Sequence, residues 1–364
     1  MKELNYIADI SLPNKSAYAV HVLKICDNFV KNGFRVNLNI YSRDEKYTFS
    51  KIKKNFLLKK KFKINHCYKS KCKRSFLNNV YFGLWCKKVI NENSLIISRS
   101  IISAIILTLL KHNVVLEIHH EMSGFTKILY NIFSKLNFLN NLRFIFIHKN
   151  LQKIFDKKKK RSIILDDCVE IEDFASKSNP SKRCVYTGSF TKGKGIELVI
   201  KLAKENPRIE FLAYGNLDTL NKIDTKSISN LKFNNYVPYN KIPSILKKNL
   251  VLLMPYQSKI GILAKNIDVS KYISPLKLFE YLAAANVIIA SKLPVYSHIL
   301  RNGYNCFLCK PNETKLWSKC IKKIFNNPKK FKFIMKNSLY TAKKYTWINR
   351  SKKIISFSEK QGLI

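Results

Sequence analysis

The chain has 364 residues, which is long enough for two or three domains that each bury a core. Apolar residues make up 46% and charged residues 25%, so bulk disorder is excluded. The 67 Lys and Arg against 23 Asp and Glu give a net charge of +44, which suits nucleic acid, an anionic membrane or a phosphate-rich substrate. Lysine supplies 57 of the basic residues, and a genome rich in AT codons explains scattered lysines without any binding role, so only dense clusters are informative.

The first half of the chain alternates short β-like runs with helical patterns. Residues 16–31 carry apolar side chains at helical spacing, and Gly33 follows where a helix C-cap belongs. A second helix is predicted at 101–111. The predicted strands are 4–10, 34–41, 94–98, 114–119, 143–147 and 162–165.

The same alternation restarts after a polar stretch at 175–182, which is typical of a linker. The tail, 311–360, is mostly helical by pattern. The predicted elements between them are strands at 184–187, 209–213, 231–234, 251–254 and 287–290, and helices at 195–204, 242–247 and 275–285.

Repeated βα units predict an α/β protein with two doubly wound, Rossmann-like lobes that face a central cleft. We expect an N-terminal domain at 1–174, a linker at 175–182 and a second domain at 183–340. A last helix at 341–364 is expected to cross back to the first domain. Ligands of such sheets bind at the carboxyl ends of the strands, so a ligand site between the lobes follows.

The glycine-bearing segment 186–195 joins a predicted strand to a helix. Glycine lets backbone amides approach an anion, and the helix N-terminus and Lys194 add positive charge, which suits a diphosphate. The spacing fits neither a Walker A loop nor a dinucleotide fingerprint, and a plain tight turn accounts for the pattern about as well.

The predicted helix that follows Ser274 is apolar except for Lys277 and Glu280, which share one face. Ser274 is a good N-cap, Pro275 suits the first helical position, and Asn286 suits a left-handed residue at the end. A carboxylate in such a helix indicates a binding site, and a solvated ion pair between the two charged residues explains the pattern equally well.

His119 ends the predicted strand 114–119, where a polar side chain can contact a ligand, although a single histidine is more often structural. Nine cysteines at irregular spacings, with one Cys-x-x-Cys pair, indicate free thiols in a reducing cytosol and no zinc site. Glu3 and Asp9 argue against a signal peptide, and the longest apolar stretch, 95–110, is too short to span a membrane. The protein is therefore expected in the cytoplasm or at the membrane periphery.

The segment 51–74 is the densest basic cluster, with eleven Lys and Arg residues and no Asp or Glu. Four apolar residues, Phe56, Leu57, Leu58 and Phe62, are interleaved with them. This mixture predicts docking on an anionic inner membrane, and a solvated loop is the competing interpretation. The contacts expected at the membrane are Lys59, Lys60, Lys61 and Phe62.

Together these features resemble GT-B glycosyltransferases of the family 4, or group 1, type. The most specific match is 274–291, which is similar to the family's helix whose Glu binds the nucleotide ribose, here Glu280. Residues 16–24 are similar to the family's first loop and helix, and Tyr345-Thr346-Trp347 to the start of its closing helix. The resemblance covers nearly the whole chain.

The resemblance implies a role for each matched position. It assigns catalysis to Glu280, His119 and Tyr272, and the acceptor side or cleft to Ser16, Ala17 and Arg99. Donor binding is assigned to Gly188, Ser189, Lys194, Ser274, Pro275, Leu276, Lys277 and Glu280.

Two positions depart from the family pattern. Tyr272 stands where the family has the first Glu of its Glu-x7-Glu motif, and Asp268 is the nearest candidate carboxylate to replace it. Ser189 stands where the family has Arg, and Lys192 or Arg183 is the expected replacement.

The implied activity is retaining transfer of a sugar from a nucleotide sugar to a saccharide or lipid-linked acceptor, in polysaccharide or lipopolysaccharide synthesis. No metal or other cofactor is expected, because lysines and helix N-termini meet the charge of the departing diphosphate. The expected partners are the nucleotide sugar, the acceptor and an anionic inner membrane, with no nucleic acid. A nucleotide-sugar epimerase of the same fold is the alternative, followed by a basic nucleic-acid-binding protein.

Overall fold

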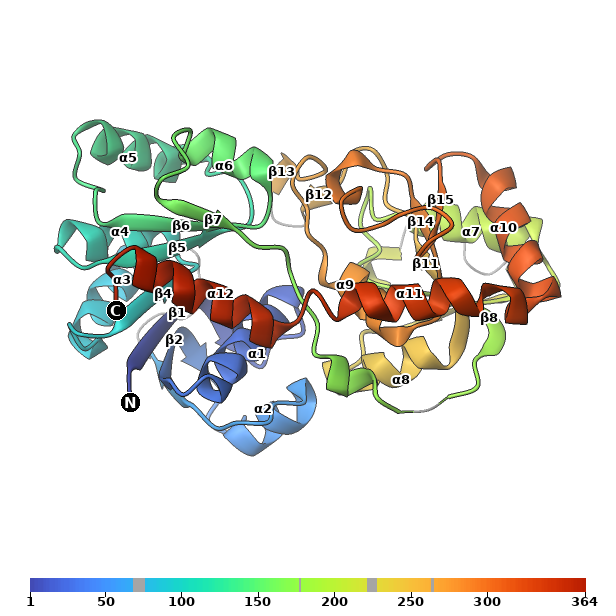
Figure 1. Ribbon diagram of the computed structural model, residues 1–364, viewed down its shortest axis with the longest axis horizontal. Helices are drawn as coiled ribbons and strands as arrows, with labels where there is room; N and C mark the ends of the chain where they lie inside the picture. The colour runs from blue at the N-terminus through green and yellow to red at the C-terminus, as the bar shows by residue number, and fades with distance from the viewer. Residues whose placement is uncertain (68–75, 177, 221–227, 263–264) are drawn as a thin grey trace. The chain divides into compact units, whose positions relative to one another are not determined.

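The computed structural model describes residues 1–67, 76–176, 178–220, 228–262 and 265–364. The chain forms two compact units, one of residues 1–166 with 347–364 and the other of residues 167–346 (Figure 1). The first unit therefore includes the C-terminal helix, and the chain leaves that unit at Asp166, before the polar stretch 175–182.

The first unit contains a seven-stranded parallel sheet with the order β3-β2-β1-β4-β5-β6-β7. The order reverses between β1 and β4, the position where doubly wound sheets bind ligands. The strands are β1 (Glu3–Leu12), β2 (Arg35–Arg43), β3 (Lys63–His66), β4 (Leu95–Ser98), β5 (Val114–Ile118), β6 (Leu142–Phe146) and β7 (Ser162–Ile164).

The helices among the described residues of this unit are α1 (Ala17–Lys31), α2 (Phe49–Phe56), α3 (Phe76–Val89), α4 (Ile101–Leu109), α5 (Gly124–Lys135), α6 (Lys149–Phe155) and α12 (Trp347–Lys360). Right-handed crossovers place α1 and α2 on one face and α3 to α6 on the other, because the chain runs from β1 toward β3 at one edge and then returns to β4 and on to β7 at the other edge. The last helix, α12, packs along α1 (Figure 1).

The second unit contains a six-stranded parallel sheet with the order β10-β9-β8-β11-β14-β15, which reverses between β8 and β11. Its strands are β8 (Ser181–Thr187), β9 (Glu210–Tyr214), β10 (Leu231–Asn234), β11 (Asn249–Met254), β14 (Val287–Ser291) and β15 (Phe307–Cys309). A short antiparallel hairpin, β12 (Gly261–Ile262) with β13 (Lys265–Asp268), lies in the connection that follows β11.

The helices of the second unit are α7 (Ile196–Glu205), α8 (Ile242–Lys247), α9 (Leu276–Ala284), α10 (Thr314–Asn326) and α11 (Lys332–Ala342). Helix α7 packs with α10, and α9 packs with α8 and α11. Short 3-10 turns lie in the described part of the chain at Ile171–Phe174, Leu217–Leu220, Tyr239–Lys241, Pro294–Tyr296 and Pro328–Phe331. Two doubly wound α/β units confirm the predicted fold class.

Both predicted ends of α9 are corrected by the structure. The helix begins one residue after Pro275, which is the N-cap, and the Ser274 hydroxyl instead accepts a hydrogen bond from the Asp167 N–H at 2.9 Å. At the other end Ala285 takes the left-handed conformation, with φ of 55°. Asn286 is buried, and its amide donates to Leu246 O at 2.9 Å, so it ties α9 to α8. No helix among the described residues is long and apolar enough to cross a membrane.

Candidate functional site

The loop between β8 and α7 is built around glycines that no other residue can replace without strain. Gly188 has φ of 145° and Gly195 has φ of 89°, conformations that side chains other than glycine rarely adopt. A Cβ at Gly195 would lie 1.9 Å from Pro255 O, and one at Gly188 would lie 2.6 Å from Lys277 Nζ. The loop is therefore pressed against a neighbouring backbone and against an amine, which favours the anion-binding interpretation over a plain turn.

Lys277 lies in the first turn of α9 and points beneath this loop. Its Nζ lies 4.0 Å from the centre of the Tyr186 ring and 5.0 Å from that of Tyr256. The residue is only 8% exposed, and its Nζ makes no hydrogen bond within the part of the chain that the structure describes. Burial, helped by the charge of Lys194, holds the pKa of Lys277 well below its usual range against the opposite effect of Glu280.

A second amine approaches the same aromatic ring. Lys194 Nζ lies 5.0 Å from the centre of the Tyr256 ring, and burial lowers the pKa of Lys194 to about 8. Two lysines thus flank one ring beside a glycine loop, and only the partly buried Glu280 opposes their charge on α9. This arrangement concentrates positive potential at the carboxyl end of β8, where a phosphate group would be stabilised.

Glu280 lies one turn after Lys277 on the same helix and is partly buried. A solvated ion pair between them, the alternative left open by the sequence, does not hold because Lys277 is buried. The next residue fixes this part of α9: Tyr281 Oη accepts the Thr187 N–H at 3.0 Å and donates to Leu253 O at 3.3 Å. Helix α9 is thereby tied to the carboxyl ends of β8 and β11.

The other predicted donor-side residues have mostly local partners. Tyr272 is buried, and Leu276 is buried at the start of α9. One carboxylate oxygen of Asp268 accepts the N–H groups of Ile260, at 3.0 Å, and Ser270, at 2.9 Å, so this carboxylate closes the turn at the β12–β13 hairpin.

The proposed replacements for the missing loop arginine lie in different places. The Ser189 hydroxyl lies 3.0 Å from the Thr191 hydroxyl, inside the loop. Lys192 is exposed in the same loop. Arg183 stands near the start of β8, toward the opposite end of that strand, and pairs with Glu210 at 3.8 Å. Lys277 is the amine that lies directly against the loop, and it comes from a different segment.

The first unit has a polar centre that the sequence did not reveal. Glu117, in the middle of β5, is buried and accepts a hydrogen bond from Tyr6 Oη at 2.8 Å. Its other oxygen lies 2.7 Å from Arg350 Nη2, 2.8 Å from His119 Nε2 and 2.9 Å from His21 Nε2. Burial raises the pKa of Glu117, but His21, Arg350 and the bond from His119 outweigh burial and hold the pKa well below its usual range.

Arg350 brings the last helix into this centre. It extends from α12, is buried, and donates to the carbonyl oxygens of Leu165, at 2.6 Å, and Asp166. The Arg350 guanidinium thus joins α12 to the residues at which the chain leaves the first unit. Trp347, the first residue of α12, packs edge-on against the His21 ring with a centroid distance of 4.9 Å.

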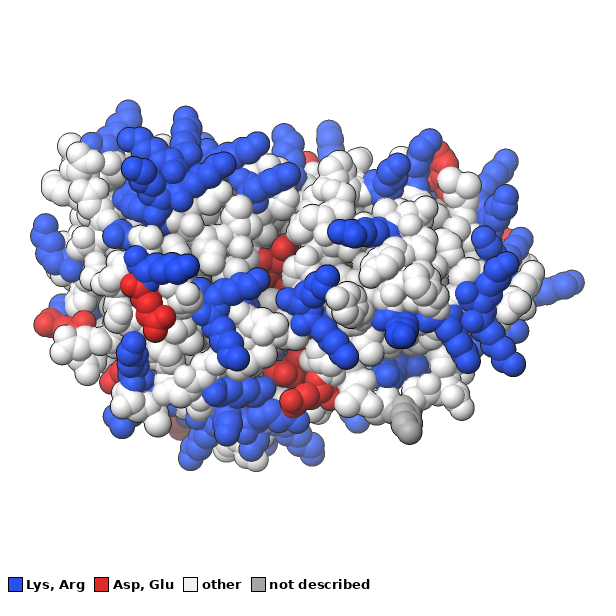
Figure 2. Space-filling view, viewed as in Figure 1, with Lys and Arg blue, Asp and Glu red and all other residues white. Residues whose placement is uncertain are grey.

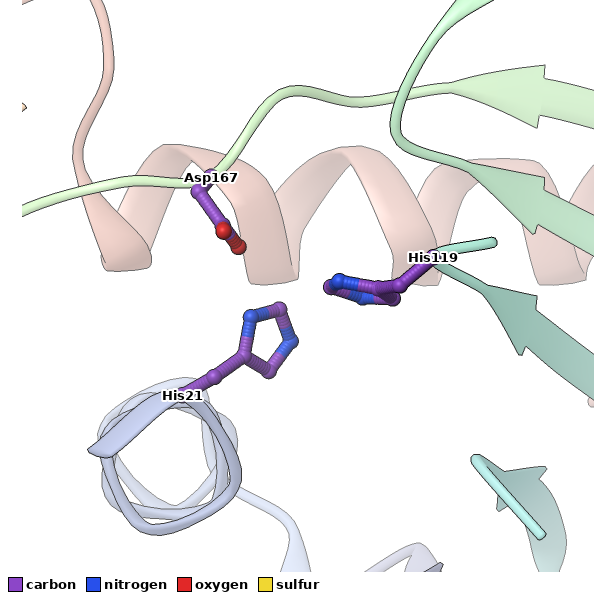
Figure 3. Close-up of side chains that lie close together, drawn as sticks. All are labelled: His21, His119 and Asp167. Carbon is purple, nitrogen blue, oxygen red and sulfur yellow. The ribbon is translucent and has the colours of Figure 1, made fainter. Parts of the chain in front are cut away.

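The two histidines of this centre face each other. Figure 3 shows His21 on α1 and His119 just after β5, and their rings pack edge to face with centroids 5.0 Å apart. The third side chain drawn there, Asp167, is the first residue of the second unit. The side chain of His119 remains 16% exposed while that of His21 is 1% exposed, so His119 is the more accessible of the two.

The predicted acceptor-side residues gather at the carboxyl end of β1 and β4. Ser16 caps α1, because its hydroxyl accepts the Ala19 N–H at 3.3 Å, and Ala17 is exposed beside it. Arg99 follows β4 and stacks on the ring of Tyr18, with Cζ 4.0 Å from the ring centre. These residues line the switch point of the first sheet, as expected for a ligand-binding edge.

In the basic segment 51–74, the structure contradicts the expectation that the interleaved apolar residues reach a membrane. Phe56, Leu58 and Phe62 are buried in the first unit and are not available to a membrane, which corrects the predicted contact at Phe62. Lys59, Lys60 and Lys61 are exposed. The backbone N–H groups of Lys59 and Lys60 donate to the Asp27 carboxylate at 2.8 and 2.6 Å, which fixes this turn to α1. Lys69, Lys71, Lys73 and Arg74 lie outside the described residues.

A family match covers most of the second unit. Residues 169–339 match the family described as glycosyl transferases group 1. This segment, slightly under half of the chain, is similar to group 1 glycosyl transferases, and we refer to it as the glycosyl transferase domain. The glycosyl transferase domain contains the loop at Gly188, both lysines and Glu280. The comparison with curated protein sequences found no match.

Solved structures resemble the chain over nearly its full length. HepE from Anabaena in complex with UDP-glucose has a TM-score of 0.68 at 12% identity, covering 100% of both chains. A TarM mutant from S. aureus, in complex with fondaparinux, α-GlcNAc-glycerol and UDP, has a TM-score of 0.74 at 12% identity, covering 98% of this chain and 99% of that one.

WaaG, a glycosyltransferase involved in lipopolysaccharide biosynthesis, has a TM-score of 0.64 at 11% identity, covering 97% of this chain and 98% of that one. Because these identities are low, the likenesses establish the fold alone. They confirm the predicted GT-B fold, and the second unit carries the match to group 1 glycosyl transferases.

Proposed function

We propose that the protein transfers a sugar from a nucleoside-diphosphate sugar to a saccharide or lipid-linked saccharide, with retention of configuration, in cell-surface polysaccharide synthesis. The observation that carries this proposal is the pair of lysines on the Tyr256 ring beside Gly188, inside a glycosyl transferase domain. Departure of the donor leaves negative charge on the diphosphate, and preorganised amines in a dry site stabilise that charge. UDP complexes of HepE and TarM support a nucleotide donor.

On the donor side, Lys194 and Lys277 neutralise the diphosphate while the amides around Gly188 and the N-terminus of α9 hydrogen-bond to it. Glu280 accepts hydrogen bonds from the nucleotide ribose. The two lysines supply the charge that a metal ion would otherwise supply, and the sequence has no Asp-x-Asp tripeptide. The reaction is therefore proposed to need no divalent metal.

On the acceptor side, His119, whose Nε2 contacts Glu117, contacts the transferred sugar. Arg99 and the exposed N-terminus of α1 at Ser16 bind the incoming saccharide. The surface-polysaccharide role is supported by the description of WaaG as a lipopolysaccharide enzyme. An acceptor of that kind is anchored in a membrane, so the protein is proposed to work in the cytoplasm at the inner face of an anionic membrane.

The test is a binding panel of UDP-, GDP- and other nucleotide sugars, read by thermal shift and then by calorimetry. We expect one nucleotide class to raise the unfolding temperature with and without EDTA. Glu280→Ala should weaken the binding free energy of that nucleotide by ~1.5–3 kcal/mol, because a charge-assisted hydrogen bond is lost. A control substitution, Lys201→Met on the exposed side of α7, should leave affinity unchanged.

Two results would contradict the proposal. The first is that no nucleotide sugar shifts the unfolding temperature. The second is that binding is lost in EDTA and returns with Mg²⁺ or Mn²⁺, which would overturn the metal-independent mechanism.

A further inference from the structure

Helix α5 exposes an apolar ridge although its opposite side is already packed on the first unit. The ridge consists of Phe125, Ile128, Ile132 and Leu136, which are 54%, 54%, 46% and 56% exposed. Their spacing of three, four and four residues places them on one side of the helix. Tyr130, on the other side, is buried and contacts Phe155 of α6 with ring centroids 5.5 Å apart. We call these four residues the α5 ridge.

Apolar exposure continues onto the neighbouring helix. Phe76, at the start of α3, contacts Phe125 edge to face with centroids 4.9 Å apart. Leu77 and Leu84 of α3 are 76% and 49% exposed. Single exposed apolar residues are ordinary, but two adjoining helices with exposed apolar faces indicate an interaction surface.

Lysines border the α5 ridge. Lys127, Asn131 and Lys135 form the next row along α5, and all three are exposed. Figure 2 shows basic side chains gathered over α6 and the turn after it, where the exposed lysines are Lys149, Lys153, Lys157, Lys158, Lys159 and Lys160.

Acidic residues do not offset this charge. The sequence has no Asp or Glu between Glu121 and Asp156. Asp156 itself is buried, and its carboxylate accepts hydrogen bonds from the Arg161 N–H at 3.0 Å and the Ser162 hydroxyl at 2.6 Å. The surface around the α5 ridge is thus purely basic over this stretch of the sequence.

We propose that the α5 ridge inserts into the interface of an anionic lipid bilayer while the lysines of α5 and α6 bind the headgroups. An apolar stripe bordered by lysines is the pattern by which surface-lying helices bind such membranes. A second copy of the chain fits poorly, because two identical lysine borders would face each other across a symmetric contact. This inference deepens the proposed function and rests on it only for the membrane location of the acceptor.

The α5 ridge is a different surface from the basic segment at 51–63, which the sequence predicted as the docking site. That segment includes α2 and leads into β3, at one edge of the first sheet, whereas α5 connects β5 to β6 near the other edge. Its apolar residues Phe56, Leu58 and Phe62 are buried, whereas those of the α5 ridge are exposed. The two surfaces can therefore be tested separately.

The first experiment is co-sedimentation of the full chain with phosphatidylglycerol–phosphatidylcholine vesicles. Ile128→Ser combined with Ile132→Ser should weaken vesicle binding about tenfold or more, because two apolar side chains no longer leave water. The matched control is Phe333→Ser with Tyr340→Ser, which removes equally exposed apolar residues from α11 and should bind as the wild type does. Binding should need the anionic lipid and weaken as salt is raised.

The second experiment compares the two basic surfaces. Lys149→Glu with Lys153→Glu should release the protein from vesicles, whereas Lys59→Glu with Lys60→Glu should have a smaller effect. The opposite order, or unaltered binding of the Ile128 and Ile132 double variant, overturns the proposal. So does a wild type that stays in the supernatant, or a double variant that loses self-association instead of vesicle binding.

Nucleotide binding separates this inference from the proposed function. Each variant is also titrated with UDP, and all of them should bind it as the wild type does. If UDP binds but vesicles do not, only the docking surface is wrong. If vesicles bind but no nucleotide does, only the proposed donor reaction is wrong.

Discussion

Replacing Lys277 with methionine should raise stability and weaken donor binding at the same time. The free protein keeps this amine buried without a hydrogen bond to any residue that the structure describes, and burial lowers its pKa and costs folding free energy. Replacing buried charged groups by apolar side chains of similar size stabilises proteins by up to ~1–4 kcal/mol. For a cooperative unit of the size of the second unit, residues 167–346, each kcal/mol corresponds to a rise of roughly 2–4 °C in Tm.

The stability gain depends on pH in the direction set by the lowered pKa of Lys277. A lysine whose folded pKa is lowered destabilises the fold fully below that pKa, and the destabilisation fades as pH rises toward the unfolded value. The advantage of Lys277→Met should therefore grow as pH falls from about 10, by up to ~1.4 kcal/mol per unit. Donor affinity should fall by ~1.5–3 kcal/mol, or roughly 10- to 150-fold, because a charged contact with the diphosphate is lost.

The assay is urea unfolding together with calorimetric titration of UDP, on Lys277→Met and on the exposed control Lys201→Met. The control should change neither quantity. A Lys277→Met variant that is less stable and binds UDP normally would refute the reasoning, because the lysine would then be a packing residue and not a binding group.

Three further predictions concern titratable groups. Because the Lys194 amine loses its proton as pH rises through about 8, UDP affinity should decline above that pH and the decline should be absent in Lys194→Met, as calorimetry would report. Arg350→Met should lower the free energy of unfolding by about 3–5 kcal/mol, because Glu117 is left buried with fewer partners. In the wild type the free energy of unfolding should fall as pH drops below ~4.3 toward the lowered pKa of Glu117, and urea unfolding measures both effects. Among the described cysteines, Cys320 should react fastest with iodoacetamide in peptide mapping, because a bond from Cys309 lowers the pKa of this partly exposed thiol to about 7.

The sequence predicted the two α/β units because each buried strand is a short apolar run bounded by polar residues. Helix α1 was recognisable because its apolar spacing, Ser16 cap and Gly33 end agree. Helices α2, α3, α5 and α6 were missed. In α3 the apolar residues lie on all sides, so the amphipathic pattern that marks a helix is absent.

The donor half of the site was also visible from local motifs. Gly188, Lys194 and α9 lie in short segments whose chemistry is apparent in the sequence. The centre around Glu117 was not, because its partners Tyr6, His21 and Arg350 are far apart along the chain and come together only through the fold. A glutamate inside the apolar run 114–118 was the signal that could have indicated it.

The return of α12 to the first unit has a consequence for synthesis on the ribosome. Residues 167–346 are translated before α12, so the second unit has its whole chain available while the first still lacks Arg350 and the helix that covers α1. Until the last residues emerge, Glu117 lacks one of its positive partners and one side of α1 is uncovered. The half of the protein that is made first is therefore the half that is completed last, and chaperones that bind exposed apolar surface would act on it for longest.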